Sequence, residues 1–250
     1  MSISKAEVIF GTRAIIEAIQ AGKELEKVLL QKGVRNELSG ELLSLLKERQ
    51  VPFSTVPIEK LNKITRKNHQ GSIAFLSAVI YASLDNIINE AYSKGQEPLL
   101  ILLDRVTDVR NFGAIARSAE CLGAHALLIP SKGSARISGD AVKASAGALH
   151  HIPVCREDNL KSTIEYLQSS GIRVVACSEK AETLTNEADM TGPLALLIGS
   201  EEDGVSPAYL KMTDAQVSIP MRGKIASLNV SVATSICLYE VVRQRNSVKN

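Results

Sequence analysis

The sequence contains no tryptophan, and aromatic residues make up only 4% of its 250 positions. Proteins that hold single-stranded nucleic acid by stacking successive bases on aromatic rings need many such rings, so that mode of binding is not expected. A charge excess of one sign is also missing, because 29 Lys and Arg against 27 Asp and Glu leave a net charge of +2. This balance excludes a strongly basic tail but allows a local basic patch.

Clustered cysteines and long apolar runs are absent as well. The four cysteines lie far apart and form no C-x-x-C pair, so we expect no metal site and a reducing compartment. No apolar run approaches the roughly 18 residues needed to cross a bilayer. The N-terminal segment has no apolar core followed by a small-residue cleavage site, and we therefore expect a cytoplasmic protein with no membrane partner.

Two hydrophobic patterns divide the chain. Short helical and strand patterns alternate over residues 1–81, which predicts a small α/β domain. From Leu99 onward, continuous apolar runs alternate with helical patterns, as in a parallel sheet covered on both faces. The intervening stretch 82–97 begins with a helix and ends in a turn-rich break. We predict an α/β protein with a domain 1–81, a linker 82–97 and a parallel-sheet domain 98–250.

The densest basic stretch of the chain falls in the first of these domains. Lys63, Arg66 and Lys67 lie there, with His69 beside them. This stretch is consistent with a solvated helix end or with a surface that faces phosphates, since clustered cations supply the sequence-independent part of nucleic-acid affinity. We expect these three cations to contact phosphates if the chain binds a nucleic acid.

Common cofactor motifs are absent. No strand is followed by G-x-G-x-x-G, and no G-x-x-x-x-G-K-[ST] occurs, which counts against a dinucleotide site and a P-loop. The sequence also lacks H-E-x-x-H and G-x-S-x-G. A ligand site must therefore be sought where parallel α/β proteins generally place one, beyond the carboxyl ends of their strands.

Three such strand ends carry unusual sequence. After the run 99–103, Asn111 is expected to cap a helix, Gly113 permits close approach, and Arg117 follows four residues later. After 194–198, three consecutive carboxylates at 201–203 stand between two glycines, which reads as an acidic turn or a site. The third segment, 217–233, leads into a helix whose polar entrance can cap that helix or contact a ligand.

Taken in order, these segments closely resemble the SpoU/TrmH family of RNA ribose 2′-O-methyltransferases. The family pattern N-x-G-x-x-x-R stands at 111–117, G-x-E-x-x-G at 199–204, and I-P-M-x-G-x-x-x-S-L-N-V-S-V-A at 219–233. In the first domain, 9–11 and 69–71 resemble the family's substrate-binding domain, so the resemblance covers nearly the whole chain. The combination is most similar to the bacterial subgroup that methylates guanosine in 23S rRNA.

The resemblance implies a C-terminal domain with a deep trefoil knot that holds S-adenosylmethionine, and a homodimer with the site beside its interface. Loop backbone atoms would supply much of the cofactor binding. The residues that would line the cofactor pocket are Gly199, Ile219, Met221, Leu228 and Asn229. Those that would form the catalytic surround are Arg117, Asn111, Glu201, Ser227 and Asn229.

One departure from the family concerns Glu202 and Asp203, where many members have glycine followed by a variable residue. Extra negative charge there should weaken RNA docking slightly unless a Lys or Arg pairs with it. Two further functions remain open at this stage: a tRNA ribose 2′-O-methyltransferase, which would use the same chemistry, and a non-catalytic RNA-binding factor in ribosome assembly. A binding-only protein would have no need of Asn111, Arg117 and the segment 227–229.

Overall fold

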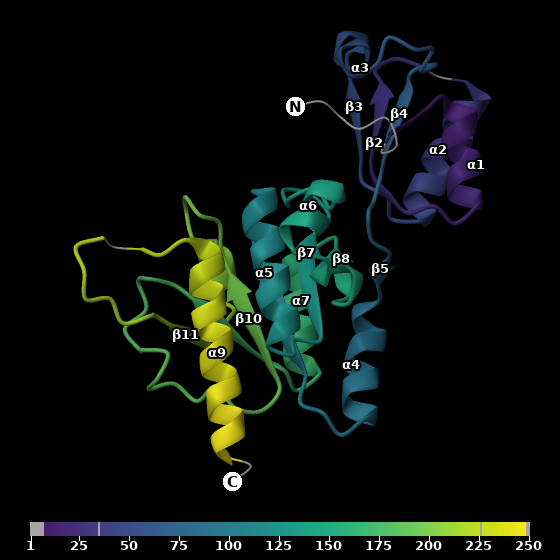
Figure 1. Ribbon diagram of the computed structural model, residues 1–250. Helices are drawn as coiled ribbons and strands as arrows, with labels where there is room; N and C mark the ends of the chain where they lie inside the picture. The colour runs from purple at the N-terminus through teal and green to yellow at the C-terminus, as the bar shows by residue number, and fades with distance from the viewer. Residues whose placement is uncertain (1–7, 35, 226, 249–250) are drawn as a thin grey trace. The chain divides into compact units, whose positions relative to one another are not determined.

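The computed structural model describes residues 8–34, 36–225 and 227–248 and divides the chain into two compact units (Figure 1). The first unit contains the residues up to Ile80 together with Arg136–Ser138, and the second contains Tyr81–Ala135 and the chain from Gly139 onward. In the part of the chain that the structure describes, no helix combines the length and apolarity that a bilayer span requires.

The first unit is a small α/β fold. Its four-stranded sheet has the order β1-β4-β2-β3, with β4 antiparallel to both neighbours and β3 parallel to β2. Helices α1 and α2 pack together through an apolar face that includes Ile15, Leu42 and Leu46. The elements are β1 (Val8–Phe10), α1 (Thr12–Gln20), β2 (Leu25–Gln31), α2 (Glu37–Glu48), β3 (Phe53–Val56), α3 (Ile58–Ile64) and β4 (Ser72–Leu76).

The second unit is built on a seven-stranded sheet of order β11-β9-β10-β6-β7-β8-β5, in which every pairing is parallel. Its strands are β5 (Tyr81–Ala82), β6 (Leu99–Leu103), β7 (Ala126–Pro130), β8 (Val154–Glu157), β9 (Arg173–Cys177), β10 (Leu194–Ile198) and β11 (Ala215–Val217). Its helices are α4 (Leu84–Ser93), α5 (Val109–Cys121), α6 (Gly139–Ala144), a 3-10 turn (Ala148–His150), α7 (Leu160–Ser169), α8 (Pro207–Leu210) and α9 (Val230–Val248).

Both faces of this sheet are covered, which explains why its central strands are apolar at every position. Leu100 and Leu102 of β6 belong to a core cluster shared with α4 and α7. On the other side, α9 contacts β9 and β10, α5 contacts β7, and the two helices lie side by side (Figure 1). Ser118 and Ser235 join α5 to α9 by a hydrogen bond of 2.7 Å. The expected parallel α/β domain is confirmed.

The helix expected at the start of the stretch 82–97 is α4. Ser83 caps it, and Leu84 and Ile88 are buried in the core of the second unit, so this stretch packs on the sheet. The partition into a domain 1–81, a linker 82–97 and a domain 98–250 stays a prediction.

Candidate active site

A cavity opens at the carboxyl ends of the neighbouring strands β11, β9 and β10. Strand β6 stands next to β10, and from β6 the sheet extends on one side through β7 and β8 and on the other through β10 and β9. Ligands of parallel α/β proteins bind at the point where the order of the strands in the sheet changes direction. The cavity is lined by residues 177–179, 198–202 and 204, by Val217, Ile219 and Met221, and by Ser227, Leu228, Val230 and Ala233.

The segment after β6 enters α5 through Asp108, not through Asn111 as predicted. The Asp108 carboxylate accepts hydrogen bonds from the backbone N–H groups of Arg110 and Asn111, at 2.8 and 2.9 Å. Aspartate is a strong N-cap because its side chain satisfies amides left open in the first turn. Asn111 lies inside that turn, and its side chain is therefore free of capping.

Asn111 instead connects all three unusual segments. Its side-chain amide donates a hydrogen bond to Glu201 and accepts one from the Asn229 amide nitrogen at 3.0 Å. The Asn229 oxygen accepts from the backbone and hydroxyl of Ser231, at 3.0 and 2.6 Å. Asn229 thus caps α9 and also belongs to the site. Helix capping and a place in the site, which the sequence offered as alternatives for this helix entrance, are therefore compatible.

Two glycines determine how closely the backbone can pack around the site. A Cβ on Gly113 would lie 2.5 Å from the Cβ of Ala144, so α5 and α6 could not approach as they do. A Cβ on Gly199 would lie 2.0 Å from the carbonyl carbon of Gly204. Both glycines therefore serve backbone packing, and Gly199 also lines the cavity.

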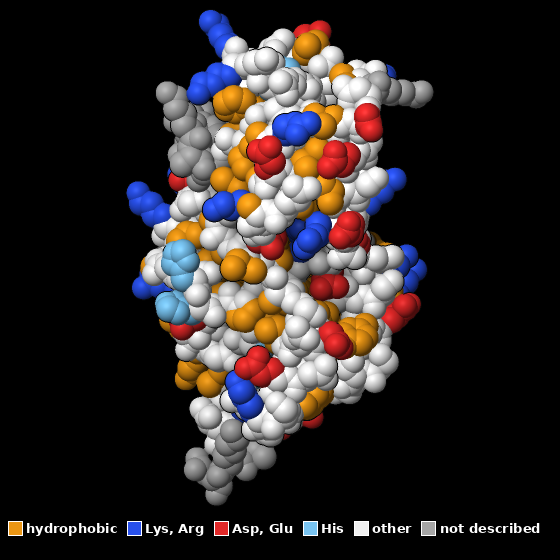
Figure 2. Space-filling view, turned by 90° about the vertical axis from the view of Figure 1, so that its right-hand side faces the viewer, with side chains coloured by type: hydrophobic (Ala, Val, Ile, Leu, Met, Phe, Trp, Pro, Cys, Tyr) orange, Lys and Arg blue, Asp and Glu red, His pale blue; other side chains and the backbone are white. Residues whose placement is uncertain are grey.

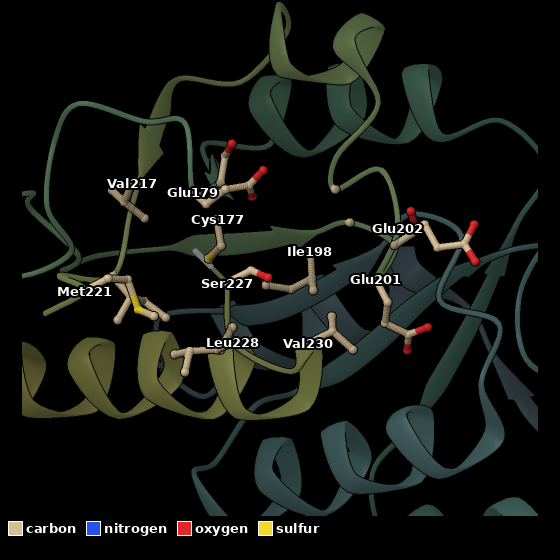
Figure 3. Close-up of a pocket in the computed structure, with 16 residues that line it drawn as sticks. Cys177, Glu179, Ile198, Glu201, Glu202, Val217, Met221, Ser227, Leu228 and Val230 are labelled. Carbon is tan, nitrogen blue, oxygen red and sulfur yellow. The ribbon is translucent and has the colours of Figure 1, made fainter. Parts of the chain in front are cut away.

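The cavity has both apolar and acidic walls (Figure 3). Val217, Met221 and Leu228 lie toward one end and Glu201 and Glu202 toward the opposite end, while Glu179 adds a carboxylate near Val217 (Figure 3). Ser227 stands between these ends, just before α9 (Figure 3). Such a lining can accommodate a ligand that has a flat apolar part and a positively charged part.

Most of the residues predicted for the site come together here. Gly199, Ile219, Met221 and Leu228 line the cavity, as do Glu201 and Ser227. Asn229, which was expected to line the cofactor pocket, is not among the lining residues, and neither is Asn111; both join the site through the hydrogen bonds Asn229–Asn111 and Asn111–Glu201. Arg117 lies apart, because its side chain is exposed and within the described residues it has no hydrogen bond or ion pair. It lies further along α5, outside the bonded cluster that contains Asn111.

Sequence reasoning missed the cavity residues that follow β9, namely Cys177, Ser178 and Glu179. The general rule for strand ends could have indicated them, but this strand end carries no glycine and its charges are of mixed sign. A hydrogen bond with Cys237 raises the pKa of Cys177 well above its usual range, so this thiol stays neutral. Among the described residues, no group of three His, Cys, Asp or Glu is arranged to hold a metal.

The basic stretch of the first unit is solvent-accessible. Lys63, in the last turn of α3, and Arg66 are exposed, and the exposed Lys67 ammonium lies 5.2 Å from the ring centre of Phe10. His69 is buried, and it bonds Asn62 and the backbone N–H of Gly71, so its role is structural. On the face shown in Figure 2, Lys and Arg side chains are interspersed with carboxylates.

A parallel α/β unit with a loop-built cavity at its strand ends, joined to a small basic α/β unit, defines a ligand-binding enzyme architecture. Residues 98–239 match the model of the SpoU rRNA methylase family, and residues 8–82 match that of the RNA 2′-O ribose methyltransferase substrate-binding domain. The chain belongs to the SpoU methylase family, and it is an RNA methyltransferase.

Individual relatives agree with this assignment. The chain is 35% identical to a TrmH family tRNA/rRNA methyltransferase of Bacillus subtilis over 97% of both sequences. The crystal structure of the SpoU methyltransferase AviRb from Streptomyces viridochromogenes in complex with AdoMet is similar, with a TM-score of 0.61, 28% identity and coverage of 96% and 90% of the two chains. A tRNA-modifying TrmH/SpoU enzyme of A. aeolicus has a TM-score of 0.56 and 29% identity, with coverage of 65% and 86%.

Proposed function

We propose that the protein transfers a methyl group from S-adenosylmethionine to a ribose 2′-hydroxyl of RNA, at a guanosine in a loop of 23S rRNA. The observation that carries this proposal is the bonded series Glu201–Asn111–Asn229, which joins the three motif segments at the mouth of one cavity. A protein that only bound RNA would have no need for this arrangement beside a ligand cavity. The matched substrate-binding domain supports RNA as the partner.

The residues present fit S-adenosylmethionine. Val217, Met221 and Leu228 provide an apolar wall suited to a purine, and Glu201 and Glu202 provide negative charge suited to a cation. When bound, the cofactor supplies an electrophilic methyl group on a positively charged sulfur. Gly199, Ile219, Met221 and Leu228 would hold it, with Asn229 bonded to Asn111 at the edge of the cavity.

Asn111, Glu201, Ser227 and Asn229 would orient the ribose that receives the methyl group. Glu201 already accepts a hydrogen bond from Asn111, so we assign it a positioning role and not that of a base. Arg117 would clamp the adjacent phosphate with two parallel hydrogen bonds and stabilise the negative charge that develops on the 2′-oxygen. A guanidinium stays protonated in proteins and cannot serve as a general base, so the proton is expected to pass to phosphate or solvent.

Incubation of the purified protein with tritiated S-adenosylmethionine and either unmodified 23S rRNA or bulk tRNA tests this function. Label in ribose 2′-O positions of rRNA is the expected result, since the target ribose must be splayed out of a loop to be reached. Label in tRNA alone would retain the chemistry and overturn the substrate. No label in either RNA would contradict both substrates.

The tRNA alternative has specific support and stays the second candidate. The A. aeolicus structure is named as a tRNA-modifying enzyme, and the B. subtilis relative carries both substrate names. The bacterial rRNA subgroup is favoured because the chain combines the catalytic unit with the substrate-binding unit, whereas the A. aeolicus enzyme aligns with only 65% of this chain. Either RNA is consistent with a cytoplasmic location.

Replacing Lys63, Arg66 and Lys67 together by glutamine is expected to raise the RNA KM and flatten its salt dependence. The slope of log affinity against log salt is negative. For single strands its magnitude decreases by about 0.7 for every phosphate that the protein no longer neutralises, so the magnitude should decrease by about two. Filter binding over a range of salt concentrations measures this slope. The matched control replaces Lys23, Lys47 and Arg49, which are also exposed in the first unit. Equal slopes for the two triple variants would rule out a role for this stretch in phosphate binding.

We also propose that two copies associate through α9, and that the end of the C-terminal domain is threaded into the deep trefoil knot that the family resemblance implies. Val232, Ile236 and Tyr239 remain 46%, 37% and 61% exposed and line an apolar groove with Ala114 and Ser118 of α5. Large exposed apolar side chains gathered in one groove are typical of an interface. We take a second copy as the occupant, because the family resemblance implies a homodimer.

Light scattering should therefore give twice the chain mass of 26.9 kDa. Ile236→Asp should shift the protein to monomers, because a carboxylate would be buried without a partner. Ile58→Asp, at a similarly exposed position in α3, should not. A monomeric wild-type protein would overturn the proposed dimer.

A further inference from the structure

The loop that follows β10 forms much of the cavity wall and carries an unusual charge. Gly199, Ser200, Glu201, Glu202 and Gly204 all line the cavity. Ser200 and Gly204 pair through two backbone hydrogen bonds of 3.1 Å, which leaves the three carboxylates 201–203 exposed at the tip of the loop. Adjacent carboxylates repel one another, so an opposing positive charge is needed to hold this tip in one conformation.

Arg105, just after β6, provides that charge. Its guanidinium donates to the Asp203 carboxylate at 3.1 Å and to the Gly204 carbonyl oxygen at 3.2 Å. It also donates to Asp104 at 3.1 and 3.3 Å. Asp104 is only 2% exposed and accepts a hydrogen bond of 2.8 Å from the backbone N–H of Ser206. Asp104 and Arg105 therefore hold the returning half of the loop at three points.

The backbone of Arg105 indicates that its side chain is required at this position. Its φ of +57° lies in the left-handed region, which is disfavoured for residues with a Cβ and in which glycine is the usual choice. Such conformations persist when surrounding bonds over-determine them, and they gather at functional sites. Here the bonds to Asp104, Asp203 and Gly204 are those surroundings. The pairing with Asp203 also offsets one of the extra charges that distinguish this loop from many family members.

We propose that Arg105 is a positioning residue for the cofactor site. By clamping Asp203 and Gly204 it holds the loop so that Glu201 meets Asn111 and the start of the loop lines the cavity. The inference rests on the proposed function only in that S-adenosylmethionine occupies this cavity. Arg105 itself does not line the cavity, so it acts through the loop and not by contact with the cofactor.

Arg105→Gly removes the guanidinium without backbone strain, because glycine adopts the observed φ. We expect the dissociation constant of S-adenosylmethionine, measured by calorimetry without RNA, to rise about tenfold, as for loss of a charge-assisted hydrogen bond. The melting temperature should fall, because the buried Asp104 loses its charged partner, and calorimetry is therefore done well below it. Hydrogen exchange of the amides of the 199–206 loop should accelerate in the absence of cofactor.

Asp203→Asn tests the same clamp from the other side. It should weaken cofactor binding, and the double variant Arg105→Gly/Asp203→Asn should bind no more weakly than Arg105→Gly alone, because both changes break one interaction. Lys211→Ala, an exposed cation in the same unit, is the control for loss of charge. Wild-type affinity in Arg105→Gly, or effects that multiply in the double variant, would overturn the proposal. The affinity for S-adenosylmethionine is measured without RNA. A failure of the wild-type protein to methylate either RNA would therefore not affect the interpretation of this measurement.

Discussion

Arg117→Ala should lower kcat for RNA methylation by about 100- to 1000-fold, the loss typical when one group that stabilises developing negative charge is removed. Cofactor affinity should be unchanged, because Arg117 does not line the cavity. Single-turnover methylation and calorimetry measure these two quantities separately. Arg110→Ala, which removes the same charge from the first turn of α5, is the matched control and should retain most of the activity.

Arg117→Lys distinguishes a clamp from a base. A lysine cannot hold phosphate through two parallel bonds, so turnover should stay low across the pH–rate profile. Unchanged turnover in this variant would contradict the clamp. A turnover that rises as the ammonium loses its proton would instead indicate that the residue at position 117 removes the 2′-hydroxyl proton.

Gly199→Ala is expected to abolish measurable binding of S-adenosylmethionine and to lower the melting temperature. The added methyl group would lie 2.0 Å from two backbone atoms, the Gly204 carbonyl carbon and the Val205 nitrogen. Backbone cannot move aside as a flexible side chain can, so the loop must open and the cavity must change shape. Calorimetry and thermal unfolding measure the two effects.

Gly223→Ala is the control for this substitution. Gly223 lies between β11 and α9, its φ is not positive, and a Cβ there would meet no atom of the described residues within 4 Å. It should bind the cofactor as wild type does. Near-normal affinity in Gly199→Ala would show that the loop tolerates the displacement and that its tight closure is not needed.

The structure explains which parts of the site the sequence could predict. Asn111, Glu201 and Asn229 were identifiable because each belongs to a dense motif, and they are bonded together in the fold. Glu179 was not, because it stands among charges of mixed sign after an ordinary strand and belongs to no recognised motif. The capping role given to Asn111 was wrong, since Asp108 stands three residues earlier and takes the open amides of the first turn.

The sequence by itself determined the parallel α/β architecture, because runs such as 99–103 are apolar at every position and only a sheet covered on both faces can bury them. It also determined the chemistry at the strand ends, through motifs long enough to specify a family. Only the tertiary structure decided that Arg105 and Asp203 meet, 98 residues apart in the chain. Strand order brings β6 beside β10, and no local pattern of charge or periodicity records which strands become neighbours.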